Sequence, residues 1–328
     1  MINIIKDNLA VIPYLLACLS LGSSLGLTIL FNRIVNVFQS APKLKNNAQG
    51  SGKLKDTSLT IIIPTFNEES NIEGCLQSIF TSEDPCEKWK IIMVDDCSED
   101  NTVKLARAKA EEMKLPTEKF LLMNAGERPV NERWVGKNWP CFKAVENLNS
   151  EWVLFIDADI RLEKQTLKRA LLQSNRENID LLSIAPKLKC GCLAEWMVQP
   201  IIASLLGFGF PFNAINDPNN SIAFAAGPFM LFRSSVYQSI GGHKNLAEEV
   251  VEDIAFAYRI KHSGYKLYYL LGLDAVELRM YQDFYSLWEG WSKNWFLGLN
   301  RSVTKALGAS LSVFIMFSIP WLMLPISC

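Results

Sequence analysis

Two carboxylates, Asp157 and Asp159, follow directly after the apolar run WVLFI at residues 152–156. In an extended chain, side chains two residues apart point to the same side at a spacing of roughly 6.5 to 7 Å, so both acids can turn toward one ion. Two unpaired carboxylates beside a hydrophobic strand repel each other and are costly to desolvate, which makes a hard divalent cation their natural partner. Such an ion would neutralise a departing diphosphate. A helix cap is the alternative interpretation of the same spacing.

Polar side chains also follow two other apolar runs. The segments are PTFNEES at residues 64–70 and VDDCSEDNT at residues 94–102. Asn67 and Glu68 in the first segment suit either a helix cap or a contact to a nucleoside. Asp95 and Asp96 in the second can bind a ribose hydroxyl or a base N–H, as acids at strand ends do, or can serve as caps. Both interpretations stay open for each loop.

A fourth group of acids lies in the segment AEEVVEDIAFAYRIKH. Four acids stand within six residues, namely Glu248, Glu249, Glu252 and Asp253. The residues expected to line the helix that follows are Ile254, Ala255, Tyr258 and Ile260. The helix macrodipole favours acids in a first turn, which accounts for some of them. Four acids exceed what a cap needs, so one of them is a candidate general base.

The elements that must position these residues alternate between strands and helices. Strands are predicted at LTIII (59–63), KIIMV (90–94), KFLLM (119–123) and WVLFI (152–156), with amphipathic helices between them. This alternation predicts a mostly parallel sheet with helices on both faces. Ligands of such sheets bind beyond the carboxyl ends of the strands, so the loops after residues 63, 94 and 156 are expected to be functional.

The chain also carries apolar segments suited to a membrane. It has 49% hydrophobic residues and a mean hydropathy of +0.11. Residues 8–32 contain no charged residue and are predicted to form a transmembrane helix, because the run is longer than the 7–15 residues of a signal-peptide core. A cleaved signal peptide is the alternative. Residues 306–328 are expected to form a second span, in which prolines are tolerated.

Residues 33–57 are basic and rich in Gly, Ser and Asn, so we expect a flexible linker. The Lys and Arg residues that flank both apolar runs predict a multi-pass protein with two spans and a cytoplasmic catalytic domain. The segment at about 191–212 is apolar but interrupted by Pro200, Gly207, Gly209 and Pro211, which favours an interfacial or re-entrant segment. A buried core helix is the alternative. We expect no nucleic-acid partner.

Several motifs together carry a resemblance to a known family. They are IIIPTFNEESNIEGCL, IIMVDDCSEDNT, GKNWPCFKAVE, EWVLFIDADIRLEKQTL, FAAGPFMLFRSSVYQSIGG and EDIAFAYRIKHSGYKL, in this order. The chain resembles the membrane-associated family 2 glycosyltransferases over roughly residues 58–300. It looks closest to members that glycosylate polyisoprenoid lipids of the carotenoid or hopanoid type. The resemblance implies an α/β fold of the GT-A kind, a Rossmann-like nucleotide-diphospho-sugar transferase domain, flanked here by transmembrane helices.

The resemblance also implies roles for individual residues. Pro64, Thr65, Asn67 and Glu68 would line the nucleotide pocket, Asp96 would contact the nucleoside, and Lys137 would lie near the diphosphate or the sugar. Asp157 and Asp159 match the metal-binding pair of the family, which holds Mg2+ or Mn2+ and the diphosphate of a UDP- or GDP-sugar. Asp253, preceded by Glu252, matches the catalytic base.

One departure from the family concerns its Gln/Arg-x-x-Arg-Trp signature, for which this chain has LWEGWSKNW. Trp288 and Trp291 are expected near the acceptor or the nucleotide, and Arg279 or Lys293 could supply the missing cation. The departure puts processive polymer synthesis in doubt.

The sequence therefore predicts an inverting glycosyltransferase that moves a single sugar from a nucleotide-sugar to the hydroxyl of a membrane lipid. The lipid could be a polyisoprenoid or sphingolipid-like. A polyprenyl-phosphate sugar transferase is the nearest alternative and would need cations around its acceptor. A catalytically silent, membrane-tethered binding protein is the other alternative, and it would be expected to have lost some of the acids that are present here.

Overall fold

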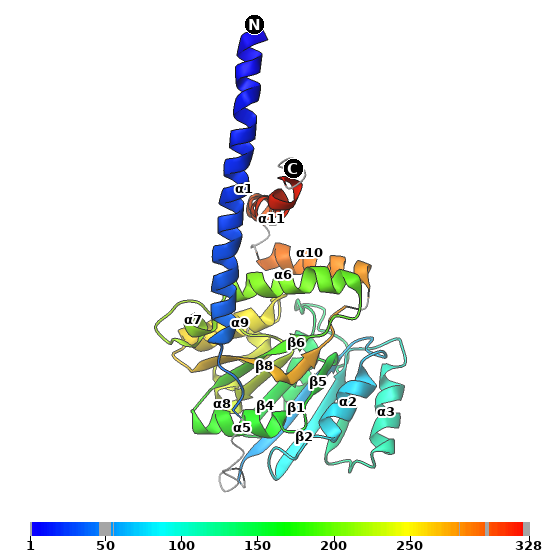
Figure 1. The fold of residues 1–328 in the computed structure, drawn as a ribbon. Helices are drawn as coiled ribbons and strands as arrows, with labels where there is room; N and C mark the ends of the chain where they lie inside the picture. Colours follow the sequence, from blue (N-terminus) through cyan, green and yellow to red (C-terminus); the bar gives the residue numbers. More distant parts are fainter. Residues whose placement is uncertain (1, 46–53, 55, 282, 299–301, 324–328) are drawn as a thin grey trace.

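An eight-stranded sheet forms the centre of the folded domain (Figure 1). The structure, a computed structural model, describes residues 2–45, 54, 56–281, 283–298 and 302–323. The strands are β1 (Ser58–Thr65), β2 (Lys88–Asp95), β3 (Phe120–Asn124), β4 (Trp152–Ile156), β5 (Ile160–Leu162), β6 (Leu181–Leu188), β7 (Phe229–Arg233) and β8 (Leu267–Leu278). Their order in the sheet is β3-β2-β1-β4-β7-β6-β8-β5.

Helices surround this sheet and extend beyond it. They are α1 (Ile2–Gln39), α2 (Ile72–Phe80), α3 (Thr102–Glu112), α4 (Asn138–Val145), α5 (Thr166–Arg176), α6 (Leu193–Gly209), α7 (Phe212–Asn216), α8 (Ser234–Ser239), the 3-10 helix η2 (Gly242–Leu246), α9 (Glu252–His262), α10 (Phe284–Gly298) and α11 (Val303–Met323). Two apolar clusters separate the layers: α2, α3 and α5 contribute to the one, and α4, α7, α8 and α9 to the other. The prediction of helices on both faces is thereby confirmed.

The strand directions agree with the predicted parallel sheet only in part. β1 pairs in parallel with β2 and β4, and β2 pairs in parallel with β3, so the four predicted strands are confirmed. β7 lies antiparallel between β4 and β6, and β5 is antiparallel to β8. The apolar pattern of a strand buried on both faces is the same in either direction, so it could not predict this reversal.

The inner side of α9 differs from the prediction. Phe256, Ala257 and Ile260 are buried, whereas Tyr258 is 53% exposed. Phe256 packs edge-on against Phe232 of β7, with ring centroids 5.1 Å apart. The prediction is confirmed for Ile260 and wrong for Tyr258, while Ile254 and Ala255 are partly buried against the same apolar cluster. It missed Phe256 and Ala257 because the apolar residues of this helix surround more than one side.

Helix α1 projects away from the sheet as one continuous helix (Figure 1). Its segment Ser20–Gln39 is long and apolar enough to cross a membrane, and 11% of that segment's window is buried. It overlaps the predicted span 8–32 and is too exposed to be a core helix. Length and composition alone support this assignment, and a signal sequence would pass the same test. No other described helix meets both criteria.

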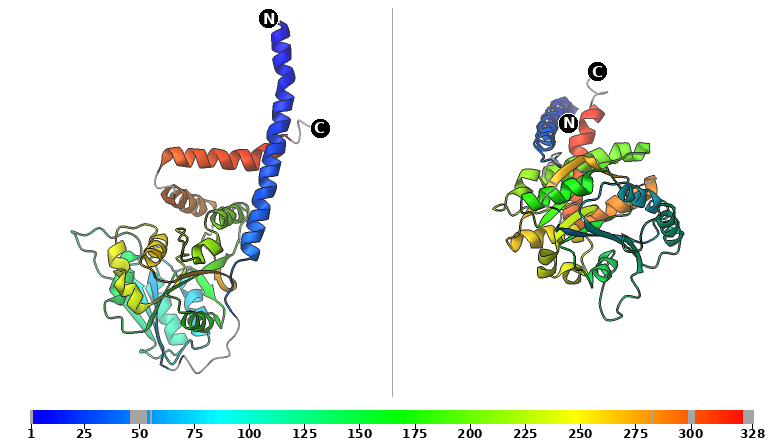
Figure 2. Two further views of the ribbon diagram at one scale, coloured as in Figure 1. Left: turned by 90° about the vertical axis from the view of Figure 1, so that its left-hand side faces the viewer. Right: turned by 90° about the horizontal axis from the view of Figure 1, so that it is seen from below.

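The predicted second span is not supported by the described residues. α11 crosses α1 instead of running beside it (Figure 2), and the part of α11 that is described in full, Val303–Ile315, is apolar but shorter than a span. Residues 324–328 of the predicted span lie outside the described residues. The multi-pass arrangement therefore stays a prediction.

The predicted flexible linker is wrong for its first part. Residues 33–39 continue α1, and Ala41 and Leu44 are buried against the domain. The Arg169 guanidinium donates to the Leu44 carbonyl at 2.5 Å and to the Lys45 carbonyl at 3.2 Å. These hydrogen bonds dock the chain against the domain despite its basic composition. Residues 46–53 and 55 of the predicted linker lie outside the described part of the chain.

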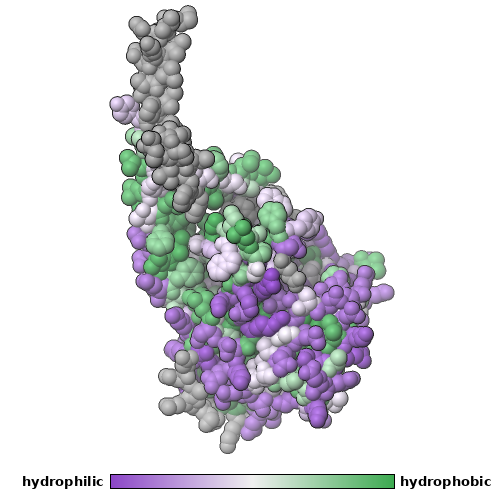
Figure 3. All heavy atoms as spheres, turned by 45° about the vertical axis from the view of Figure 1, so that its right-hand side comes forward, coloured by the Kyte–Doolittle hydropathy of each residue, from purple (hydrophilic) through white to green (hydrophobic). Residues whose placement is uncertain are grey.

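The predicted interruptions of residues 191–212 are wrong for Pro200 and Gly207, through which α6 runs unbroken, but the helix does end at Gly209, before Pro211. One missing N–H does not end the helix, which packs against both α1 and α10. The alternative of a buried core helix fails as well, since Trp196 and Met197 are each 64% exposed. Exposed apolar side chains of α6 and α10 form what we call the apolar platform: Leu193, Trp196, Met197, Phe208, Phe284, Tyr285 and Trp288. The two helices run across the axis of α1 at its base (Figure 1), where apolar residues gather on the surface (Figure 3).

Candidate active site

A cavity of about 690 Å³ lies beyond the carboxyl ends of β1, β2 and β4. It is lined by Pro64, Thr65, Phe66, Glu68, Asp96, Cys97, Gly126, Glu127, Arg128, Gly136, Lys137, Pro140, Asp157, Ala158 and Asp159. All three loops singled out in the sequence contribute to it, as does the loop between β3 and α4. The structure thus brings together most of the predicted donor-side residues.

Side chains tie the first two loops to each other. The Asn67 N–H donates to Ser98 Oγ at 2.9 Å, and Asn67 Oδ1 accepts from the Glu99 N–H at 2.9 Å. The Glu68 N–H donates to Thr102 Oγ1 at 2.7 Å. The N-cap of α2 makes no side-chain hydrogen bond, so the capping interpretation is wrong for the first loop. Asn67 holds the loops together and is not among the residues that line the cavity.

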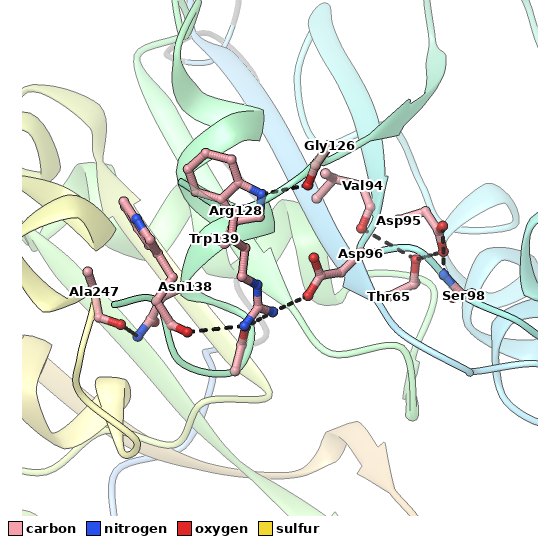
Figure 4. Close-up of polar contacts among 12 residues, drawn as sticks. Thr65, Val94, Asp95, Asp96, Ser98, Gly126, Arg128, Asn138, Trp139 and Ala247 are labelled. Carbon is pink, nitrogen blue, oxygen red and sulfur yellow. Dashed lines mark hydrogen bonds and ion pairs between the residues drawn. The ribbon is translucent and has the colours of Figure 1, made fainter. Parts of the chain in front are cut away.

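Asp96 is fixed at the end of β2 by backbone and side-chain contacts. Its N–H donates to the Thr65 carbonyl at 2.9 Å, and its carboxylate pairs with the Arg128 guanidinium. Arg128 also donates to the carbonyls of Trp134 and Gly136, each at 3.1 Å. Figure 4 shows Arg128 reaching from the loop after β3 to Asp96. The sequence analysis missed Arg128, although its loop also follows the carboxyl end of a parallel strand.

Asp157 and Asp159 lie in a turn between β4 and β5, so the extended spacing expected for them is wrong. Both nevertheless line the same cavity. Asp159 Oδ1 is buried and has no hydrogen-bond partner in the part of the chain that the structure describes. Burial and the neighbouring Asp157 charge raise the pKa of the Asp159 carboxyl to about 8. An orphaned buried oxygen beside a second carboxylate fits a divalent cation, which would supply the missing partner.

Within the described residues, no group of three or more His, Cys, Asp or Glu side chains is arranged to hold a metal ion. Two carboxylates alone are few for Mg2+ or Mn2+. These ions commonly keep several water molecules and bind through one or two carboxylates together with phosphate oxygens. Asp157 and Asp159 therefore fit an ion that is completed by a bound diphosphate.

Lys137 stands at the start of α4 and connects two acidic groups. Its Nζ lies 2.5 Å from Asp157 Oδ1 and 3.1 Å from Glu252 Oε1. Burial lowers the pKa of Lys137, but the charges of Asp157 and Glu252 outweigh it and hold that pKa well above its ordinary value. The ammonium group thus joins the turn after β4 to the first turn of α9.

Asp253 is held by backbone donors on both carboxylate oxygens. Oδ2 accepts from the Gly227 N–H at 2.9 Å, and Oδ1 accepts from the Ile254 N–H at 2.8 Å. Burial, and next the Glu252 charge, raise the pKa of Asp253 to about 7. A carboxyl with a pKa near neutrality can accept a proton during a reaction at physiological pH. The sequence analysis missed Gly227, although it precedes β7 at the same edge.

Trp288 and Trp291, the two tryptophans of α10 with described side chains, do not line the cavity. Trp288 is 64% exposed and belongs to the apolar platform. The Trp291 ring packs against the Tyr281 ring, with centroids 6.2 Å apart, and Trp291 Nε1 is buried without a hydrogen-bond partner. The Arg279 guanidinium lies 3.9 Å from the Glu195 carboxylate, and Lys293 is exposed. The cations that line the cavity are Arg128 and Lys137, and not the expected Arg279 or Lys293.

Comparisons with known proteins point to one family. Residues 60–241 match the family described as Glycosyl transferase family 2. The chain is 26% identical over 260 residues to 4,4'-diaponeurosporenoate glycosyltransferase of Staphylococcus aureus (strain MRSA252). That match covers 77% of this chain and 64% of the relative, so the chain spans less than two thirds of the relative's length.

A solved structure shares the fold over most of the chain. It is the mannosyltransferase PcManGT from Pyrobaculum calidifontis in complex with GDP-Man and Mn2+. The TM-score is 0.60 at 18% sequence identity, and the match covers 93% of this chain and 83% of that chain.

Proposed function

Because the chain belongs to glycosyl transferase family 2 and has the α/β GT-A fold, we propose that it transfers one sugar from a nucleotide-sugar to a membrane lipid. The observation that carries the proposal is the meeting of five acidic side chains at a single sheet edge, two of which are bridged by Lys137. Asp96, Asp157 and Asp159 line the cavity, and Lys137 connects it to Glu252, the neighbour of Asp253. The reaction would invert the anomeric centre.

The donor would occupy the cavity with its nucleoside near Asp96. Pro64, Thr65 and Glu68 would line the nucleotide part, as the cavity lining supports. The related structure contains GDP-Man and Mn2+, which supports a UDP- or GDP-sugar and a divalent ion as ligands here. Asp157 and Asp159 would hold Mg2+ or Mn2+, which when bound stabilises negative charge on the leaving diphosphate.

The chemistry of transfer would depend on Asp253. Its carboxylate takes the proton of the acceptor hydroxyl as that oxygen attacks the anomeric carbon, and the bond from this carbon to the diphosphate oxygen breaks. The N–H groups of Gly227 and Ile254 orient the carboxylate. Glu252 contributes by pairing with Lys137 and by raising the pKa of Asp253 through its charge.

The acceptor would reach the site from a lipid surface. The name of the Staphylococcus aureus relative supports a polyisoprenoid acceptor. The apolar platform lies at the base of α1, and its Trp196 and Trp288 are suited to the boundary between headgroups and acyl chains. As part of the proposal, the catalytic domain lies on the cytoplasmic side of the membrane. Helix α1 would form one span and the C-terminal helix a second.

The test is to express the full chain and to identify which lipid gains a glycosyl mass by mass spectrometry. Cells that carry Asp159→Asn provide the matched control, since the expected product should disappear with the acid that holds the metal. Absence of any glycosylated lipid with the wild-type chain, together with failure of the purified protein to bind UDP- or GDP-sugars with Mn2+, would overturn the proposal.

A further inference from the structure

Lys137 is held firmly where it stands. The neighbouring Asn138 is buried, and its Nδ2 donates to the carbonyls of Leu246 at 2.7 Å and Glu249 at 2.9 Å, which precede α9. The Trp139 indole donates to the Gly126 carbonyl at 2.9 Å (Figure 4). The start of α4 is therefore anchored both to the segment before α9 and to the loop after β3. Lys137 points from a fixed backbone into the site.

The position of the Lys137 ammonium conflicts with a metal at the same carboxylate. Its Nζ lies 2.5 Å from Asp157 Oδ1, whereas Mg2+ binds carboxylate oxygens at about 2.0 to 2.1 Å. A divalent ion on Asp157 would stand within a few ångströms of a positive charge in a partly buried site. Asp159 Oδ1, a second oxygen open to the ion, has no hydrogen-bond partner among the described residues. In this arrangement the lysine supplies the positive charge that a metal would otherwise supply.

A bound diphosphate would reduce the repulsion between the divalent ion and the Lys137 ammonium. Its negative charges would be shared between the ion and the ammonium, so the two cations could then stand close together. Lys137 keeps a second partner throughout, because Glu252 Oε1 lies 3.1 Å from its Nζ. The lysine can give up Asp157 to the ion and stay paired through Glu252 and the diphosphate.

We propose that Lys137 is a built-in counter-ion of the metal pair, which keeps a divalent cation weakly bound until a nucleotide diphosphate arrives. The inference rests on the proposed function, since it concerns the same donor site. It assigns Lys137 a positioning role: the residue makes the binding of metal conditional on the donor. A metal-loaded site without a donor is thereby disfavoured.

The test measures Mn2+ binding by electron paramagnetic resonance on the full-length protein in detergent, first without nucleotide and then with UDP or GDP. For the wild type we expect weak binding without nucleotide and at least about tenfold tighter binding with one of the two. For Lys137→Met we expect Mn2+ to bind without nucleotide at least about tenfold more tightly than to the wild type.

Two control variants distinguish the effect of the Lys137 charge on Mn2+ binding from an effect of substitution in this helix as such. Lys137→Arg keeps the positive charge and is expected to bind Mn2+ as weakly as the wild type. Lys143→Met removes a lysine from the same helix, one that pairs with Glu146 at 2.6 Å and does not line the cavity, so no change is expected. Circular dichroism establishes that each variant is folded.

The inference is overturned if folded Lys137→Met binds Mn2+ without nucleotide no more tightly than the wild type. If that variant does not fold, Mn2+ binding to the wild type without nucleotide serves as the test. Tight binding there contradicts a counter-ion role. Failure of the proposed function has a different signature, in which neither UDP nor GDP changes the Mn2+ affinity of any variant. In that case, the Mn2+ affinities of the wild type and Lys137→Met without nucleotide still show whether the Lys137 charge weakens metal binding.

Discussion

The donor cavity and the apolar platform differ in whether their side chains find partners within the protein. Beside the cavity, Asp253 is held by two backbone N–H groups, and on the cavity wall Asp157 is paired with Lys137. On the platform, Trp196 and Met197 are each 64% exposed, and no described residue covers that exposed surface. The chain completes its donor site with its own hydrogen bonds, whereas the platform buries its apolar surface only against something external. The difference indicates a preorganised donor site next to a surface completed by lipid.

The largest effect is expected from the metal pair on the donor side. Asp159→Asn should lower turnover by about 10³-fold or more, because the bound ion would contribute several kcal/mol of charge stabilisation. Binding of the nucleotide-sugar in the presence of Mn2+, followed by calorimetry, should weaken as well. Asp84→Asn, at an exposed acid that lies 3.7 Å from Lys119, is the control and should behave as the wild type. Unchanged turnover in Asp159→Asn would contradict the metal assignment.

A smaller effect is expected at Gly227, whose N–H positions the Asp253 carboxylate. A Cβ on Gly227 would stand 3.2 Å from Asp253 Oδ2, closer than ordinary contacts, and 3.4 Å from Lys137 Nζ. Gly227→Ala should therefore displace the carboxylate and lower kcat by about 100-fold, with little change in donor affinity. Gly209→Ala is the matched control, because nothing lies within 4 Å of a Cβ there. An equal loss of kcat in both variants would show that Gly227 has no particular role.

The pH dependence tests the same base without displacing it. The pKa of Asp253 is raised to about 7, so the carboxyl is protonated and inactive as a base below that pH. At saturating Mn2+, kcat/KM should rise through pH 7 and be about tenfold lower at pH 6 than at its plateau. Glu252→Gln removes a charge that raises this pKa, so the rise should move to lower pH. A profile that does not depend on pH between 5 and 8 would exclude Asp253 as the titrating base.

The smallest effect is expected on the apolar platform. Replacing Trp196 and Trp288 by Ser should raise KM for a lipid acceptor in vesicles about fivefold and leave donor affinity unchanged, because these side chains would contact lipid alone. Leu121→Ser, at a residue of β3 that is 50% exposed, is the control outside the platform. If KM for the donor rose together with KM for the lipid, the platform and the cavity would not be separate in function.

The two regions also differ in how far the sequence could predict them. The strands β1 to β4 and the acids at their ends were predictable, because parallel strands bring their carboxyl ends to one edge. The same rule would have pointed to Arg128 had it been applied to the loop after β3. Gly227 could not be found this way, since it depends on β7 entering the sheet antiparallel, and strand direction leaves no trace in an apolar run.

Segments beyond the sheet were predicted less well, because long-range packing decides them. Pro200 predicts a break, yet α6 continues through it between α1 and α10. The basic stretch after α1 predicts a flexible linker, yet Leu44 is buried and Arg169 binds its carbonyl. Composition describes what a segment would do alone. It does not include the neighbours that hold these segments in place.

The most direct test of the central claim compares turnover with donor binding in Asp253→Asn. The account predicts that turnover of the lipid acceptor falls by about 10³-fold, because the amide cannot accept the hydroxyl proton. Binding of the UDP- or GDP-sugar with Mn2+, measured by calorimetry on the same preparation, should stay within about twofold of the wild type, since Asp253 lies outside the cavity lining. Turnover retained in this variant, with donor binding intact, would contradict the account.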